Sequence, residues 1–407
     1  GRAWQAFVAF AKMSLGTAKA LWFFIADLRS FFGWFENWFY TRVVSAICGS
    51  LTLFATYHFA KKYFGSTAIA ILSAAILAVL PSHVFYSRLG FQEALSALLF
   101  ILGFYFYLFP RTLSFKTLLS AFLFALVFFA NYRMIVGPVL VIAAECYLSI
   151  TEKKWPDFRK LMWFVLIFLS VVFLVGGLDG AKNTRVTFAW MFYQSHLAKE
   201  SFDWVNFLSF PYYVFKLEHI LLGLAFFGNI YFLFKREWAK ALPFFIVCVQ
   251  MTGFSLAMEK GARYLCVVLP FICMAAAVFI VDLFQKFNDK KKRCAIVSIV
   301  LILMIGMLVK SVAISGFKSD YKQVVQELEK HDPEFKAMAT QTFILNLYLE
   351  KPDRILEMPK NFTSLMNLYR RGYRYVIIDP QAFISWTEDE RRFTNLKGHM
   401  NFFLNKA

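Results

Sequence analysis

The sequence predicts a polytopic α-helical membrane protein that ends in a small α/β domain. Of its 407 residues, 59% are hydrophobic and the mean hydropathy is +0.55, which is too apolar for a soluble protein of this length. The apolar residues fall in blocks of roughly 17 to 22, the length that a helix needs to cross a hydrocarbon core about 30 Å thick. From about Lys318 onward the composition is that of an ordinary soluble protein.

Residues 1–40 are expected to form interfacial helices of a first outer loop. Charged residues interrupt the apolar stretches 4–18 and 20–39, and aromatic side chains surround those charges, which is typical of helices at headgroup level. We therefore divide the chain into this loop, a transmembrane domain over 41–313 and an α/β domain over 314–407.

About ten crossings follow in order. Each is an apolar block bounded by charged or turn-forming residues. The blocks span residues 41–60, 66–86, 91–109, 118–130, 134–150, 161–177, 217–234, 241–258, 264–284 and 295–312. The many phenylalanines, 51 in all, suit helix surfaces that face lipid.

The distribution of Lys and Arg between loops gives the orientation. One set of loops holds 16 basic residues and the other holds 8, although the second set is longer. Because basic residues favour the cytoplasmic side, the turn after residue 86, the long loop 178–215 and the C-terminal domain are predicted to face outward. Topology also explains the net charge of +18, so we expect no nucleic-acid partner.

The C-terminal domain is predicted to contain strands alternating with helices. Strands are expected near 336–340, 354–357 and 375–379, with helices over 321–330 and 362–371. This alternation indicates a mainly parallel sheet. No Gly-rich phosphate loop is present, so nucleotide binding is not indicated.

Four cations and one carboxylate in the short outward turns are the candidate site. They are Arg88, Arg133, Lys260, Arg263 and Glu93. A guanidinium grips phosphate oxygens with two hydrogen bonds, so the cations suit an anionic lipid headgroup. The alternative is that they snorkel to the headgroups. Glu93 is a candidate base, an acceptor for sugar hydroxyls or a metal ligand; otherwise it pairs with Arg88 or stabilises the helix start.

Four segments resemble the GT-C glycosyltransferases of the protein-mannosyltransferase and aminoarabinose-transferase type (family 39-like). They are the run that opens at Arg42, the turn PSHVFYSRLGFQEA with its Arg and Glu, the segment NYRMIVGP and the helix start GARYLCVVLP. They occur in the family's order, on one predicted membrane side, and the resemblance covers roughly residues 1–285. The family also commonly ends in a soluble extracytoplasmic domain.

The resemblance implies an enzyme that transfers a sugar from a polyprenyl-phosphate donor to an extracytoplasmic protein, lipid or glycan, in the bacterial inner membrane. It assigns a supporting catalytic role to Glu93 and carrier-phosphate binding to Arg133, Arg263 and Tyr264, beside Arg88 and Lys260 from the charge argument. The family's catalytic Asp belongs where Gly1-Arg2 stand, so we expect it upstream of a truncated start. The superfamily allows a divalent metal, but the sequence shows no ligand set for one.

Two other functions stay open. A transporter of an anionic lipid-linked substrate would place charges or broken helices near the middle of the membrane, whereas this sequence places them at one face. A catalytically inactive relative that binds the lipid carrier would explain the missing acidic pair.

Overall fold

The computed structural model describes most of the predicted transmembrane domain and part of the C-terminal domain. The described residues are 21, 25, 37–110, 112–174, 208–255, 262–316, 321–339, 345, 349, 354–359 and 362–377. The chain forms two compact units, Gly1–Ser315 and Gly316–Ala407, and each is described by itself. The predicted interfacial helices of residues 1–40 lie almost wholly outside the described residues.

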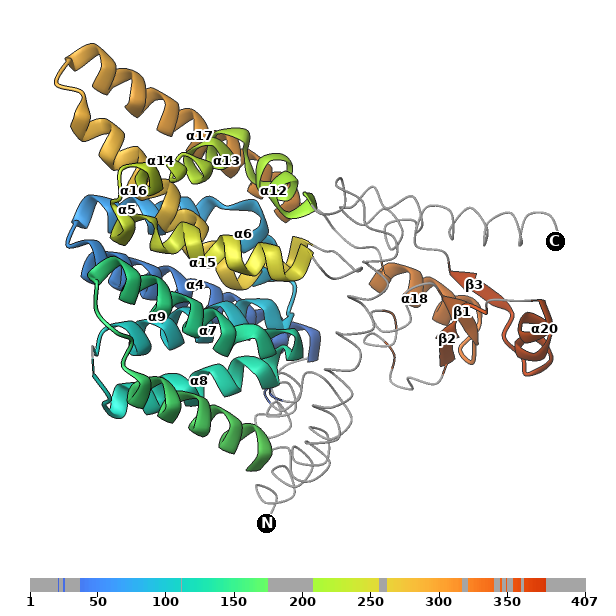
Figure 1. Cartoon of the computed structure of the whole chain (residues 1–407). Coiled ribbons are helices and arrows are strands. Elements are labelled where there is room, and N and C mark those ends of the chain that lie inside the picture. The colour runs from blue at the N-terminus through green and yellow to red at the C-terminus, as the bar shows by residue number, and fades with distance from the viewer. Residues whose placement is uncertain are drawn as a thin grey trace. The chain divides into compact units, whose positions relative to one another are not determined.

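The first unit is a bundle of helices (Figure 1). Its labelled helices are α4 (Asn37–Phe64), α5 (Thr67–Val79), α6 (Pro81–Arg88), α7 (Gln92–Leu108), α8 (Phe115–Ala130), α9 (Gly137–Glu152), α12 (Ser209–Tyr213), α13 (Ile220–Phe227), α14 (Ile230–Phe234), α15 (Trp238–Ser255), α16 (Leu269–Lys286) and α17 (Lys290–Gly316). Residues 158–174 are also helical. α7 packs between α4 and α8, α5 packs on α4 and α16, and α15 packs on α9 and α16.

The second predicted crossing is a broken helix. α5 and α6 meet at an angle of 59°, and Pro81 is the first residue of α6. Proline lacks the N–H that would continue the helix, but its fixed φ suits a first helical position. Leu80 between the two helices is extended, with φ −68° and ψ 120°. The proline therefore ends one helix and starts the next in a new direction.

α7 is buried along nearly its whole length. Phe100 and Phe104 pack edge to face against Phe124 and Phe271, with ring centroids 5.2 to 6.0 Å apart. Gly103 makes room for this cluster, because a Cβ there would lie 2.8 Å from the Phe124 ring. Phenylalanines therefore serve the core as well as exposed helix surfaces, because their rings interlock edge to face.

Four described helices are long and apolar enough to cross a membrane, and the bent pair α5–α6 makes a fifth candidate. The four are Phe39–Phe64, Met134–Glu152, Arg263–Lys286 and Lys290–Ser315. Three shorter apolar helices, Gln92–Leu108, Phe115–Ala130 and Ile220–Phe234, accompany them. Ten crossings therefore stay a prediction.

The second unit contains a three-stranded parallel sheet. Its strands are β1 (Ala337–Ala339), β2 (Ile355–Glu357) and β3 (Tyr375–Ile377), in the order β2-β1-β3. α18 (Tyr321–His331) precedes the sheet, and α20 (Phe362–Arg370) connects β2 to β3. The strands and helices lie where the sequence predicts them. Val325, Phe335, Ala337 and Ile355 form the core of this unit.

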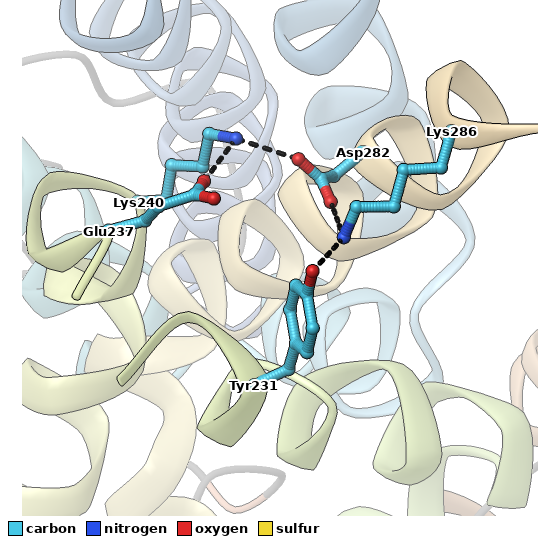
Figure 2. A network of polar contacts seen from close by, with 5 residues as sticks. All are labelled: Tyr231, Glu237, Lys240, Asp282 and Lys286. Carbon is cyan, nitrogen blue, oxygen red and sulfur yellow. Dashed lines mark hydrogen bonds and ion pairs between the residues drawn. The ribbon is translucent and has the colours of Figure 1, made fainter. Parts of the chain in front are cut away.

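A network of ion pairs and one hydrogen bond joins α14, α15 and α16 at the predicted cytoplasmic end of the bundle (Figure 2). Asp282 of α16 pairs with Lys240 of α15 and with Lys286, each at 2.7 Å. Lys240 also pairs with Glu237 at 2.6 Å, and Lys286 Nζ donates to the Tyr231 hydroxyl of α14 at 2.5 Å. These lysines, which the sequence explains by topology alone, therefore also hold the helix ends together.

We predict that Asp282→Asn lowers the melting temperature in detergent by a few degrees. The carboxylate is 14% exposed and serves two lysines, and exposed pairs contribute roughly 0.2 to 1 kcal/mol each, so a loss of about 1 kcal/mol is expected. Glu237→Gln is the control, because it removes one pair and leaves Asp282 with both partners. Equal melting temperatures for the two variants would contradict this role of Asp282.

Candidate functional site

Several interruptions of helical structure meet at the end of the bundle opposite the ion-pair network. They are the turn between α6 and α7 and three short segments: η1 (Tyr132–Val136), the π-helical η2 (Val214–Glu218) and η3 (Ala262–Val268). η3 packs on α6 and α7, and η2 packs on α6. The helices that follow η1 and η3 have a proline in their first turn, which separates them from the preceding segments.

Glu93 is buried in the first turn of α7. It is 3% exposed, and Gln92 Nε2 donates to its Oε1 at 3.3 Å. Gly90 allows the preceding turn, because its φ is +70° and a Cβ there would lie 2.8 Å from Thr41 Oγ1 of α4. Ser45 Oγ donates to the Phe91 carbonyl at 3.0 Å. The carboxylate is thus held at a helix N-terminus, where negative charge is favourable.

Arg263 and Tyr264 lie in η3, which packs on α7, the helix that carries Glu93. The Tyr264 side chain is 6% exposed and stacks on Phe254 at 5.4 Å, while Arg263 is exposed and lies 5.5 Å from the Tyr264 ring centroid. η3, which carries Arg263, packs on the helices α7 and α6, which carry Glu93 and Tyr86. A buried carboxylate and an exposed cation therefore lie near each other.

Gln250 ties η1 to η3. It is 2% exposed, and its Nε2 lies 3.5 Å from the Tyr264 carbonyl and 3.8 Å from Met134 Sδ. This amide brings the backbone segments that carry Arg133 and Arg263 to one end of the bundle. The sequence analysis did not identify Gln250, because it is a lone amide in an apolar block.

Glu218 is a second buried carboxylate of this region, and the sequence analysis missed it. It is 4% exposed, its Oε2 accepts from the Ser82 N–H at 3.2 Å, and its charge reaches Tyr86. The Ser82 N–H is one of the donors that a helix start leaves unpaired. A signal was available: a carboxylate inside the predicted crossing 217–234 is costly and marks a functional candidate.

The other predicted site residues are placed differently. Arg88 Nη1 donates to the Ile314 carbonyl near the end of α17 at 2.8 Å, so its guanidinium has a structural partner. The backbone of Arg133 lies in η1, but its side chain, Lys260 and the chain start at Gly1 lie outside the described residues. The phosphate-binding roles of these residues and the position of a catalytic Asp thus stay predictions.

The described residues contain no group of three or more His, Cys, Asp or Glu side chains that could hold a metal ion. Glu93 and Glu218 do not form such a group, even though both act on Tyr86. The described part of the site offers two buried carboxylates, a tyrosine and a guanidinium, which are groups that can accept protons and bind an anion.

Comparison with solved structures shows which known folds the chain resembles. No family model and no curated protein matches the chain. The structure of ArnT from Cupriavidus metallidurans in the apo state is 13% identical with a TM-score of 0.57, and the match covers 90% of this chain and 83% of that one. The same protein bound to undecaprenyl phosphate is 14% identical with a TM-score of 0.53, over 86% and 78% of the two chains.

An oligosaccharyltransferase from Archaeoglobus fulgidus in the apo form is 12% identical with a TM-score of 0.50, over 79% of this chain and 50% of that one. These likenesses show that the chain shares the fold of these ArnT and oligosaccharyltransferase structures, which agrees with the fold that the sequence resemblance implies. Membership of a particular family within that fold stays a prediction.

We predict that Glu218→Ala lowers the melting temperature and that Glu218→Gln does so much less. Alanine leaves the Ser82 N–H without this acceptor, which costs roughly 1 to 3 kcal/mol for a buried group, whereas the glutamine amide oxygen still accepts. Thermal unfolding of the purified chain in detergent measures both. Equal losses for Ala and Gln would show that the carboxylate charge, and not the hydrogen bond to α6, is what matters.

Proposed function

We propose that this chain is a membrane glycosyltransferase that moves a sugar from a polyprenyl-phosphate donor to an acceptor on the extracytoplasmic side. The observation that carries the proposal is the packing of η3, which bears the exposed Arg263, on α7, whose first turn bears the buried Glu93, in a bundle that shares the fold of solved sugar-transferase structures. The undecaprenyl phosphate bound to one of the similar structures supports a lipid-linked donor.

The proposed reaction is an inverting displacement at the anomeric carbon. The acceptor hydroxyl oxygen attacks that carbon, and the bond from the sugar to the phosphate oxygen breaks with its electrons going to the phosphate. A carboxylate takes the hydroxyl proton. The products are a glycoside and free polyprenyl phosphate, and the charge that grows on the phosphate is stabilised by nearby cations.

Each residue of the site has a proposed part in this reaction. Arg263 holds the donor phosphate, since a guanidinium is exposed there and presents several donors. Tyr264 fixes the direction of Arg263 by packing under it. Glu93 accepts a hydrogen bond from the donor sugar or the acceptor, as a supporting group to the carboxylate that takes the proton.

The transporter alternative receives no support from this arrangement. A transporter site lies near the bilayer midplane, whereas Glu93 lies in the first turn of α7 and Arg263 lies in η3 directly before α16, both at one end of the bundle. The inactive-relative alternative is separated from the enzyme by experiment: it would bind the donor and transfer nothing.

We predict that Glu93→Gln reduces sugar transfer roughly 10- to 100-fold, because a hydrogen bond to a charged group contributes about 1.5 to 3 kcal/mol, and leaves the folded yield unchanged. The assay follows label moving from a panel of polyprenyl-phosphate sugars to membrane acceptors. Glu152→Gln at the end of α9, an exposed carboxylate, is the matched control. Transfer by Glu93→Gln at the unaltered rate would remove Glu93 from the site.

We predict that Arg263→Ala weakens the binding of polyprenyl phosphate by roughly 10-fold or more, because a hydrogen bond to a charged group contributes about 1.5 to 3 kcal/mol. Acceptor KM should change far less. Arg159→Ala, which removes an exposed arginine from the predicted cytoplasmic side, serves as the control. Equal effects of Arg263→Ala on donor and acceptor would contradict a role in holding the phosphate.

A further inference from the structure

Each strand of the second unit, which we also call the small unit, is directly preceded by a cationic residue. Lys336 precedes β1, Arg354 precedes β2 and Arg374 precedes β3. The strands are parallel, and Ala337 pairs with both Ile355 and Tyr375. The three cations therefore lie side by side at the edge of the sheet where its strands begin, in the order Arg354, Lys336, Arg374. Neighbouring strands are about 4.8 Å apart, which places these charges well within one Debye length of each other.

The end of α20 adds two more cations to this edge. α20 returns the chain from the far end of β2 to the start of β3, so its C-terminus lies at the same edge, with Arg370 and Arg371. Gly372, with φ +93°, makes the turn into β3, and Lys336 Nζ lies 3.5 Å from the Arg371 carbonyl. We call Lys336, Arg354, Arg370, Arg371 and Arg374 the basic edge.

Aromatic rings lie among these cations. Arg374 is 4.2 Å from the centroid of Tyr369, which is 47% exposed. Tyr373 lies 5.8 Å from Lys336 and 5.9 Å from Arg371. Arg and Lys over tyrosine rings keep their charge, and tyrosine itself is a residue of membrane interfaces.

The charge of the basic edge is not neutralised within the described residues. Among the described residues Asp332 and Glu334 precede Lys336, against five cations, and Asp332 Oδ1 accepts the Glu334 N–H. Asp353, which directly precedes Arg354, lies outside the described residues. Arg354 Nη1 donates to the Pro333 carbonyl at 2.5 Å. The ion pair that the structure gives between described residues of this unit is Lys330 with Glu327 on α18. An anionic partner therefore suits this edge.

The chain keeps this unit close to a membrane surface. α17, an apolar helix long enough to cross a bilayer, ends at Gly316, and α18 begins at Tyr321. The five Cα-to-Cα steps from Gly316 to Tyr321 span at most about 18 Å when extended, at roughly 3.6 Å per step. A layer of lipid headgroups is thus present at high effective concentration, and an anionic layer attracts cations that lie near its surface.

We propose that the basic edge binds the anionic phospholipid headgroups of the membrane surface from which α17 emerges. This contact orients the small unit on the bilayer. It does not depend on the proposed transferase activity, because neither Glu93 nor Arg263 takes part in it.

Amide hydrogen exchange of the full-length chain in nanodiscs tests this interaction. We expect exchange in the segments 354–357 and 369–377 to be roughly 10-fold slower in discs containing phosphatidylglycerol than in phosphatidylcholine alone. The difference should disappear at 1 M salt, where the Debye length is about 3 Å. Identical exchange in both lipids would overturn the proposal.

A matched pair of charge reversals makes the test specific. Arg371→Glu should abolish the slowing by phosphatidylglycerol, whereas Lys322→Glu, in the first turn of α18 and away from the sheet's basic edge, should retain it. Both variants must exchange like the unaltered chain in phosphatidylcholine, which shows that they fold. Slowing by inorganic phosphate in phosphatidylcholine discs, with none from phosphatidylglycerol, would overturn the proposal in favour of a soluble anionic ligand.

Discussion

Backbone groups that leave a helix inside an apolar bundle need another hydrogen-bond partner, and this requirement shapes the end of the bundle that carries the candidate site. An unpaired backbone group in such surroundings costs several kcal/mol. In this bundle the partners are side chains from distant parts of the chain. Ser45 serves the Phe91 carbonyl, Glu218 serves the Ser82 N–H, and Gln250 reaches the Tyr264 carbonyl.

The same requirement explains why polar and charged side chains lie at that end of the bundle. A proline or a glycine interrupts a helix, a polar side chain is then retained to satisfy the exposed backbone, and further charges are tolerated beside it because the local environment is already polar. Glu93 and Arg263 lie where two such interruptions meet. The opposite end also carries charges, but there Asp282 forms ion pairs with Lys240 and Lys286.

The sequence predicts the elements better than their long-range contacts. The strands near 337, 355 and 375 and the short turn at Glu93 could be predicted, because alternation, helix starts and charge between apolar blocks are local signals. The partner of Arg88 could not be predicted, since Ile314 is 226 residues away. Every residue has a backbone carbonyl, so the sequence does not distinguish the one that accepts this hydrogen bond. Glu218 was overlooked because hydropathy averages over a whole block, and a single buried carboxylate disappears in that average.

The last helix of the first unit is more than a connection to the sheet. Lys310 Nζ donates to the carbonyls of Lys216 and Glu218, Ser311 Oγ donates to the Val79 carbonyl at the break between α5 and α6, and Ile314 accepts from Arg88.

These contacts determine where chimeras of such proteins can be joined. A swap of C-terminal domains made upstream of Lys310 would import a foreign helix end and strip the broken helix of its partners. A junction after Ile314 would exchange the sheet-bearing unit and leave the surroundings of the candidate site unchanged.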